Sequence, residues 1–350
     1  MGIPVTISID AMGGDHAPDI VIDGVRLAHV RLPHVRYLLF GDTARIEPLL
    51  SKYPELNGVC TIRHTDEVVT MDAKPGQVLR TGRKSSMWLA VDAVAKGDAA
   101  GVVSAGNTGA LMAVSKFVLR PLPGIDRPAI AGMFPTERGE TVMLDLGANV
   151  DCDSDNLVQF ALMGEVFARA VLGLEKPSVG LLNIGSEDMK GNDAVRAAAV
   201  ILREGNLPIH FHGFVEGNDI CAGTVDVVVT DGFTGNIALK TAEGTAKFFS
   251  SFMRQAFHNS LLAKIGFLFA KQALNKVKMR TDPRRYNGAM FLGLGGIAVK
   301  SHGGTDAFGF SNAIGVAVDL VSHGYNERIR KELEHLQQFD ASQRRVAASS

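Results

Sequence analysis

Cysteine and tryptophan are scarce in this sequence, whose 350 residues include 3 cysteines and 1 tryptophan. The cysteines, Cys60, Cys152 and Cys221, form no CxxC pair, and an odd number leaves one of them over. This pattern argues against a disulfide framework or a zinc site and favours a reducing compartment. No apolar run approaches the roughly 20 residues of a membrane-spanning helix, and the first residues lack the basic and then apolar pattern of a secretory signal. We therefore expect a cytoplasmic protein without a metal site.

An excess of charge of one sign is also missing, because the formal net charge is -1. A protein with this balance has no global attraction for nucleic acid. Nucleotide-binding fingerprints are absent as well. No GxxxxGK[ST] stretch occurs, and residues 293–296 (GLGG) lack the third glycine of GxGxxG and are predicted to form a tight turn. We expect no nucleic-acid partner and no cofactor.

What the sequence does contain is an alternation of short apolar runs with helical patterns. Strands are predicted at residues 5–9, 37–40, 100–104, 141–144, 178–183, 210–214 and 225–230. Helices are predicted at 21–30, 85–95, 109–119, 156–172, 193–203 and 236–251. This order favours an α/β fold with a mostly parallel sheet and helices on both faces. We expect one domain over residues 1–338 and a disordered tail at 339–350.

Five loops that follow predicted strands are rich in small polar residues. They are residues 10–16, 104–109, 145–149, 183–190 and 231–236. In parallel sheets, ligands bind in the loops at the carboxyl ends of the strands. These loops are therefore where a site is expected.

Two of the loops have the composition of an anion site at the start of a helix. Glycine lets a ligand approach the backbone, and free N–H groups at a helix N-terminus attract an anion. A small oxyanion such as phosphate would fit there. The alternative is that their Asn and Thr side chains are ordinary helix N-caps. The candidate phosphate-binding residues are Ser104, Gly106, Asn107, Thr108 and Gly109 in one loop and Thr234, Gly235 and Asn236 in the other.

Titratable side chains lie close to these loops. Lys190 and Lys240 are candidates to pair with a dianion, and His302 and His16 are candidates to donate a hydrogen bond to an oxyanion or to move a proton. The alternative for both histidines is a turn position. Asp145, Asp231 and Asp306 are candidates to orient these groups, and their alternative is to cap the next turn.

Cys152 is a poor candidate for a nucleophile. Asp151 and Asp153 flank it, and neighbouring carboxylates raise the pKa of a thiol. Together with Asp155, these aspartates resemble a loose metal loop, but capping of the helix that follows is the simpler interpretation.

A basic, apolar segment stands out near residues 247–285. Between residues 254 and 285, eight Lys or Arg face one acid, which gives a local charge of +7. We expect two short helices, with a break at Gly266. The composition suits an anionic bilayer or an acidic protein, and the alternative is packing on the core or on a second subunit. The candidate contact residues are Lys264, Phe267, Leu268, Phe269, Lys271, Lys276, Lys278, Arg280, Arg284 and Arg285.

Taken together, the loops resemble those of the phosphate acyltransferase family, the acyl-carrier-protein:phosphate acyltransferases of bacterial phospholipid synthesis. The resemblance covers about residues 5–325. The matching stretches are 10–16 (DAMGGDH), 104–110 (SAGNTGA), 144–149 (LDLGAN), 182–187 (LNIGSE) with 190–191 (KG), 213–217 (GFVEG), 231–236 (DGFTGN), and 300–303 (KSHG) with Asp306.

The resemblance implies a fold similar to isocitrate and isopropylmalate dehydrogenases and to phosphotransacetylases, without their nucleotide site. It also implies transfer of a fatty acyl group from acyl carrier protein to inorganic phosphate. A membrane glycerol-3-phosphate acyltransferase would consume the acyl phosphate. The family further implies a homodimer that associates peripherally with the inner face of the cell membrane.

Phosphate is itself a nucleophile, so the expected mechanism needs no covalent enzyme intermediate. The two glycine loops would position it. Lys190, Lys240 or His302 would stabilise the oxyanion, and His302, His16 or water would protonate the leaving thiolate. Asn183 and Asn149 are expected hydrogen-bonding partners, and Asp10 is a supporting residue. The alternatives are a phosphotransacetylase-like enzyme acting on acyl-CoA and a non-enzymatic scaffold that binds carrier or membrane.

Overall fold

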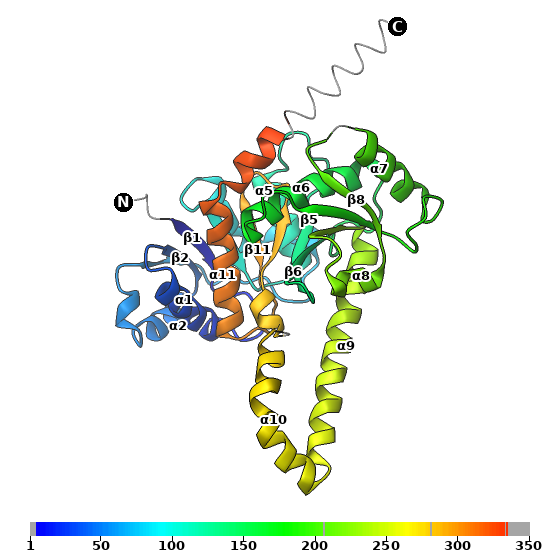
Figure 1. Ribbon diagram of the computed structural model, residues 1–350. Helices are drawn as coiled ribbons and strands as arrows, with labels where there is room; N and C mark the ends of the chain where they lie inside the picture. Colours follow the sequence, from blue (N-terminus) through cyan, green and yellow to red (C-terminus); the bar gives the residue numbers. More distant parts are fainter. Residues whose placement is uncertain (1–4, 206, 281, 333, 335–350) are drawn as a thin grey trace, which may run out of the picture.

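A single sheet of 11 strands organises the described part of the chain (Figure 1). The computed structural model describes residues 5–205, 207–280, 282–332 and 334, so the predicted tail at 339–350 lies outside the described residues. The strand order is β3-β2-β1-β4-β11-β10-β5-β6-β9-β7-β8. The strands are β1 (Thr6–Asp10), β2 (Arg36–Gly41), β3 (Cys60–His64), β4 (Gly101–Ser104), β5 (Ala129–Pro135), β6 (Glu140–Leu144), β7 (Ser178–Leu182), β8 (His210–Val215), β9 (Val227–Val229), β10 (Ala289–Leu292) and β11 (Ile297–Lys300).

The sheet consists of two parallel halves that run in opposite directions. β3, β2, β1, β4 and β11 are mutually parallel, and so are β6, β9, β7 and β8. Between them, the pairs β11–β10, β10–β5 and β5–β6 are antiparallel. The carboxyl ends of the strands therefore form two separate groups of loops.

Helices cover both faces of this sheet, as predicted. Along the strands, successive buried residues belong to different cores: Val103 packs with one core and Val102 with the other. The first core takes α1 (Asp19–Arg31), α2 (Thr43–Leu50), α6 (Ser154–Leu172), α7 (Asp193–Glu204) and α11 (Ala307–Ser322). The second takes α3 (Pro75–Thr81), α4 (Ser86–Ala95), α5 (Thr108–Leu119) and α8 (Gly217–Ala222).

The basic, apolar stretch at residues 247–285 forms most of a helical hairpin that projects from the body (Figure 1). It consists of α9 (Gly232–His258) and α10 (Leu261–Arg280), followed by the short 3-10 helix η2 (Pro283–Tyr286). Two helices were expected, but a break at Gly266 was wrong, because Gly266 lies inside α10. The chain turns instead at Asn259 and Ser260, and the Ser260 hydroxyl caps α10 by accepting from Ala263 N at 3.0 Å.

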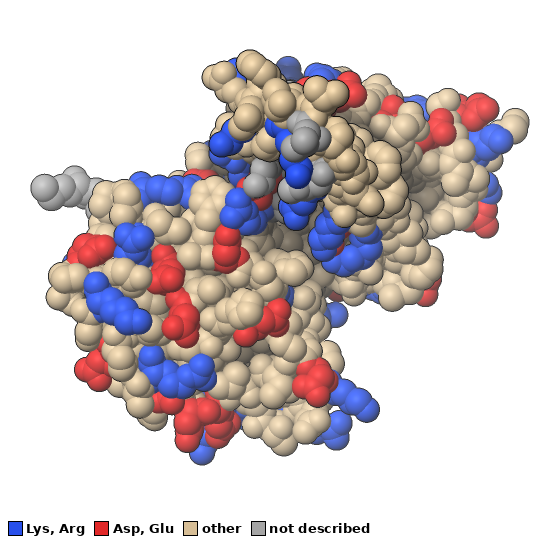
Figure 2. All heavy atoms as spheres, turned by 90° about the horizontal axis from the view of Figure 1, so that it is seen from below, with Lys and Arg blue, Asp and Glu red and all other residues tan. Residues whose placement is uncertain are grey.

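Much of the apolar surface of the hairpin faces solvent. Leu262, Leu268 and Phe269 have exposed fractions of 81%, 68% and 87%. Viewed from below, the hairpin shows tan and blue atoms over most of its surface (Figure 2). The side chains of Lys278 and Arg280 lie outside the described part. Among the described residues, no helix is both long and apolar enough to cross a bilayer.

Candidate functional site

The first group of loops follows β1, β4 and β11, which are parallel neighbours in the sheet. At its centre is the buried carboxyl group of Asp10. Ser104 Oγ donates to Asp10 Oδ2 at 2.6 Å, and Ser86 Oγ donates to Asp10 Oδ1 at 2.6 Å. Burial raises the pKa of Asp10, and both hydroxyl donors oppose that rise. Asp10 therefore ties the β1 loop to the β4 loop and to the start of α4.

Lys300 is a buried cation in the same group. It is only 7% exposed, and its Nζ donates to the backbone oxygens of Ala105, at 3.2 Å, and Ser301. Burial lowers the pKa of Lys300 to about 8, although Asp10 and Asp15 act in the opposite direction. The ammonium joins the 104–109 loop to the 301–304 loop. We did not predict a role for Lys300 or Ser86 from the sequence, although Lys300 opens the KSHG stretch.

Close backbone approach in this group requires glycine at position 13. A Cβ at Gly13 would lie 2.5 Å from Asp10 Oδ2 and 2.7 Å from the amide nitrogen of Gly106. Both separations are far shorter than a carbon can tolerate. The absence of a side chain therefore allows the 10–16 loop to lie directly against the 104–109 loop.

Two predicted phosphate ligands in the 104–109 loop, Ser104 and Asn107, already form hydrogen bonds within the chain. Ser104 Oγ, besides donating to Asp10, accepts from Gly106 N at 3.0 Å. Asn107 caps α5, with Oδ1 accepting from Ala110 N at 2.9 Å, and its amide donates to Met71 O at 2.7 Å. The N-cap interpretation is thus right for Asn107.

Within the described chain, the groups without a hydrogen-bond partner at the start of α5 are backbone amides. The amides of Asn107, Thr108 and Gly109 have no backbone partner among the residues that the structure describes. Thr108 and Gly109 are also exposed. Unpaired N–H groups and the helix dipole together make this end electropositive. An anion would meet these amides and the Thr108 hydroxyl.

The second group of loops follows β6 and β9 in the other half of the sheet. Asp145 accepts hydrogen bonds from the amides of Ile130 at 2.8 Å and Asn149 at 2.7 Å, and from Asn149 Nδ2 at 2.9 Å. Gly147 N and Ala148 N donate to it as well. With so many donors, Asp145 fixes the shape of its own loop.

The start of α9 packs tightly on that loop. A Cβ at Gly235 would lie 1.9 Å from the backbone oxygen of Asp145. Asp231 caps the helix, accepting from Thr234 N at 2.8 Å and from Thr234 Oγ1 at 2.7 Å. Asn236 lies against Gly147. Unlike α5, the first turn of α9 has most of its donors in use.

Asn183 and Lys190 belong to the loop after β7, the neighbour of β9. The register pairs Leu181 with Val229, so Asn183 extends beside Asp231. Asn183 Nδ2 donates to Lys190 O at 3.2 Å, while the Lys190 side chain is exposed. The two residues therefore share one loop that borders the start of α9.

His302 connects the first group electrostatically with α9. Its Nδ1 accepts a hydrogen bond from Gly304 N at 3.1 Å. The neutral ring therefore carries its proton on Nε2, from which it can donate a hydrogen bond. Partial burial lowers the pKa of His302, and the charge of Lys300 adds to this. Lys240 on α9 contributes in the same direction, while Glu243 opposes it. His302 is accordingly a neutral hydrogen-bond donor near pH 7, within electrostatic range of Lys240 and Glu243 on α9.

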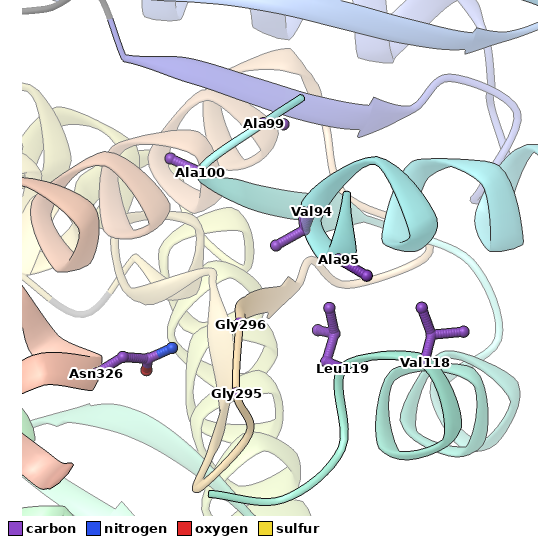
Figure 3. A pocket seen from close by; sticks show the side chains of 9 residues that line it. All are labelled: Val94, Ala95, Ala99, Ala100, Val118, Leu119, Gly295, Gly296 and Asn326. Carbon is purple, nitrogen blue, oxygen red and sulfur yellow. The ribbon is translucent and has the colours of Figure 1, made fainter. Parts of the chain in front are cut away.

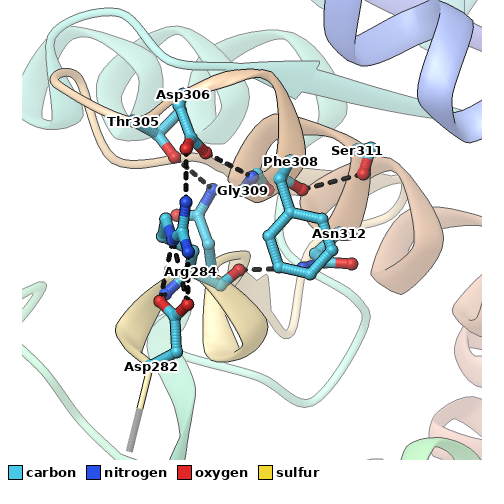
Figure 4. Close-up of polar contacts among 9 residues, drawn as sticks. Asp282, Arg284, Thr305, Asp306, Phe308, Gly309, Ser311 and Asn312 are labelled. Atoms are coloured by element: carbon cyan, nitrogen blue, oxygen red, sulfur yellow. Dashed lines mark hydrogen bonds and ion pairs between the residues drawn. The ribbon is translucent and has the colours of Figure 1, made fainter. Parts of the chain in front are cut away.

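Three further predicted residues lie at the margin of this arrangement, where two of them pair with other charged residues. Asp306 does not bond His302: it caps α11 through Gly309 N at 3.0 Å and pairs with Arg284 at 2.7 Å (Figure 4). Arg284 also pairs with Asp282. Lys240 pairs with Glu243 at 2.9 Å, and His16 is exposed at the start of α1. The 282–286 end of the hairpin is thus anchored to the loop that follows β11.

The thiol of Cys152 is not activated. Burial raises its pKa to about 12, and the charges of Asp145 and Asp231 add to the rise. The predicted direction was right, although burial rather than Asp151 and Asp153 is the main cause. Asp153 caps α6, accepting from Asn156 N at 2.8 Å, as the capping interpretation predicted. Among the described residues, no group of three or more His, Cys, Asp or Glu is placed to hold a metal.

A pocket of about 300 Å³ lies elsewhere, at the amino ends of β4 and β11 (Figure 3). It is lined by Val94, Ala95, Ala99, Ala100, Val118, Leu119, Gly295, Gly296 and Asn326. None of the predicted site residues contributes to it. The candidate site is therefore at the opposite ends of these strands.

Comparison with known proteins identifies the family. A family model described as "Fatty acid synthesis protein" matches residues 5–328. The phosphate acyltransferase of Paramagnetospirillum magneticum is 76% identical over 350 residues, which is 100% of both chains. That of Rhodospirillum centenum is 68% identical over 331 residues, covering 95% of this chain and 93% of the relative. The chain belongs to the phosphate acyltransferase family.

Solved structures with low sequence identity share the fold of this chain. A phosphotransacetylase from Streptococcus pyogenes is 17% identical with a TM-score of 0.63, covering 91% of this chain and 94% of that one. A branched-chain phosphotransacylase from Enterococcus faecalis is 14% identical with a TM-score of 0.53, covering 91% and 99%. The predicted α/β fold class and the predicted enzyme class are both confirmed. Acyl transfer to phosphate is the reaction class of the family.

Proposed function

We propose that the protein transfers a fatty acyl group from acyl carrier protein to inorganic phosphate. The observation that supports this best is the contact between two loops. One leads into the N-terminus of α5, with its free amides, and the other carries His302. Ser301 N donates to Ser104 O at 2.9 Å, and Lys300 Nζ donates to Ala105 O. These bonds join a helix end that suits an anion to the loop that carries a neutral hydrogen-bond donor.

In the proposed reaction, phosphate binds to the free amides of α5 and to the Thr108 hydroxyl. One phosphate oxygen attacks the thioester carbonyl carbon. The new C–O bond forms, the C–S bond breaks, and the products are acyl phosphate and the carrier thiol. Alignment of the two reactants by fixed backbone groups lowers the entropic part of the barrier.

Two kinds of charge would be stabilised during this step. The carbonyl oxygen becomes an oxyanion, for which Lys240 and Lys190 are the candidate partners. The departing thiolate would be stabilised by a hydrogen bond from His302 Nε2–H, and water would supply the proton that completes the carrier thiol. Asn183, Asn149 and Asn236 border the α9 side of the site, and Asp145 and Asp231 hold their loops in place.

The hairpin supports a role at a membrane. Its exposed Leu262, Leu268 and Phe269, set among lysines and arginines, suit the headgroup region of an anionic bilayer. We propose peripheral association with the inner face of the cell membrane, where a glycerol-3-phosphate acyltransferase consumes the acyl phosphate for phospholipid synthesis. We also propose that the protein is a homodimer and that part of the same apolar surface is buried between the two subunits.

The decisive experiment is turnover of a long-chain acyl carrier protein with and without inorganic phosphate. Hydroxylamine would trap any acyl phosphate as the hydroxamate. Phosphate-dependent release of the carrier thiol, together with trapped product, is the expected result. Faster turnover of acyl-CoA than of the carrier thioester would favour the phosphotransacetylase-like alternative. Carrier or vesicle binding without turnover would favour a scaffold.

A further inference from the structure

The segment at residues 71–86 encloses one side of the candidate site and has no assigned role. Asn107 Nδ2 donates to Met71 O at 2.7 Å and to Ala73 O at 3.1 Å. A Cβ at Gly303 would lie 3.0 Å from Met71 Cε, and one at Gly109 would lie 3.1 Å from Pro75 Cγ. The segment therefore rests on both the α5 loop and the His302 loop.

Its other end is also fixed to the site. Ser86 donates to Asp10, and Ser85 caps α4 by accepting from Trp88 N at 3.3 Å. The Thr65 hydroxyl donates a hydrogen bond to Lys84 O at 2.6 Å. Both ends of the segment are thus bonded to the candidate phosphate loop or its supporting network, so the stretch between them lies beside the candidate site.

That stretch, residues 74–84 (the basic segment), carries four cations and no acid: Lys74, Arg80, Arg83 and Lys84. All four are exposed, and none forms an ion pair within the part of the chain that the structure describes. The Arg83 guanidinium lies 5.9 Å from the centre of the Trp88 ring. The nearest acids along the chain are Asp66, Glu67 and Asp72, which precede the segment. Unpaired surface cations beside a site attract an anionic partner.

The composition of the basic segment distinguishes between two kinds of anionic surface. Binding to a bilayer requires exposed apolar side chains beside the cations, as in the hairpin. Within residues 74–84, Val78 is buried and Leu79 packs against the second core. An acidic protein surface needs only the cations. The segment therefore suits a protein partner, while the hairpin suits a membrane.

We propose that the basic segment is the docking surface for the acidic carrier protein that presents the acyl thioester. This inference rests on the proposed function. The carrier must remain outside the site while its thioester reaches the start of α5, and the basic segment is the charged surface that borders that point. Arg80 and Lys84 are the contacts expected to matter most: Arg83 lies over the Trp88 ring, whereas Arg80 uses only Nε, in a bond to Gly76 O at 3.1 Å, and keeps its other guanidinium nitrogens for a partner.

The test compares donors with and without the carrier. In an Arg80→Glu plus Lys84→Glu variant, kcat/KM for the acyl carrier protein should fall at least 10-fold, mainly through KM, and its dependence on salt should weaken. The uncharged donor acyl-pantetheine should react within 2-fold of the wild-type rate. The matched control is Arg36→Glu plus Lys52→Glu, which makes the same charge change on two exposed residues, one at the start of β2 and one just after α2.

Three results would overturn the proposal. Equal losses with both donors would make the basic segment part of the phosphate or thioester site. A matching loss in the control would indicate a net-charge effect. A loss of binding to anionic vesicles, with carrier kinetics unchanged, would assign the segment to the membrane.

A direct titration of carrier protein onto the folded variants separates this inference from the proposed function. Carrier binding that weakens in the double variant, in a protein without phosphate-dependent turnover, would retain the docking surface and refute the enzyme activity. Carrier binding that is unchanged would refute the docking surface alone.

Discussion

At the scale of single residues, Lys300 offers the sharpest test of the site. Its ammonium is buried and bonded to Ala105 O and Ser301 O, and its pKa is lowered to about 8. The titratable groups that interact with it are Asp10, Asp15 and His302. As pH rises through about 8, the cation between the two loops is lost. We therefore predict that kcat/KM for acyl-pantetheine declines above pH 8 in the wild-type protein.

A Lys300→Met variant should lose at least 10-fold in kcat/KM at pH 7 and should lack this alkaline decline. A Lys300→Arg variant, which stays charged, should move the decline to higher pH. Because burial disfavours the ammonium, the folded state binds its proton less tightly than the unfolded state. The methionine variant should therefore unfold in urea with a free energy no lower than that of the wild type at pH 7. An unchanged pH profile would contradict this role.

The sequence predicted residue roles only where they depend on neighbours in the chain. Asn107 and Asp153 cap helices that start beside them, which is a local pattern. The bonds of Ser86 to Asp10 and of Lys300 to Ala105 join residues that are 76 and 195 positions apart. Such pairs depend on strand order, which no local pattern specifies. For this reason the buried network was missed.

At the scale of elements, two glycines of α9 should respond oppositely to alanine. A Cβ at Gly235 would collide with Asp145 O, whereas a Cβ at Gly244 meets nothing within 4 Å. We predict that Gly235→Ala costs more than about 2 kcal/mol of unfolding free energy, because the start of α9 must shift. Gly244→Ala should be neutral or stabilise by up to about 1 kcal/mol, since alanine favours a helix.

Urea unfolding followed by circular dichroism measures both variants. The Gly244→Ala protein is the control for added helix propensity in the same helix. If both variants lost the same stability, the tight contact between α9 and the 145–149 loop would be refuted.

Elements with a strong apolar period were predicted well, and weak ones were not. The predicted helices at 156–172 and 193–203 correspond to α6 and α7, and the predicted turn at 293–296 joins β10 to β11. The missed strands include β5 (AIAGMFP) and β10 (AMFL), in which small residues or methionine replace the β-branched residues that signal a strand. These two strands form the antiparallel pairs at the centre of the sheet. Because they were not predicted, the opposite directions of the two parallel halves were not predicted either.

At the scale of the whole molecule, the hairpin should decide membrane binding without affecting chemistry. Leu268 and Phe269 are well exposed, whereas Phe267 packs on Phe257, with ring centroids 5.4 Å apart. We predict that Leu268→Ser plus Phe269→Ser reduces binding to anionic vesicles at least 10-fold, because two apolar side chains no longer enter the bilayer. Vesicle co-sedimentation measures this.

Turnover of soluble carrier thioester should stay within 2-fold in this variant. The control is Val30→Ser plus Val200→Ser, which removes two exposed apolar side chains from the body, with exposed fractions of 67% and 49%. Vesicle binding that survives in the hairpin variant, or turnover that disappears with it, would show that the hairpin serves another purpose.

The strand order also has a consequence for how the protein is made. β1, β2, β3 and β4 lie within the first 104 residues, yet β4 pairs with β11 at residues 297–300, and α1 packs against α11. During synthesis, one edge of β4 and one face of α1 stay uncovered until most of the chain has left the ribosome. An unpaired apolar strand edge is prone to aggregation. The first 104 residues of this protein therefore cannot finish folding until residues 297–322 have been synthesised.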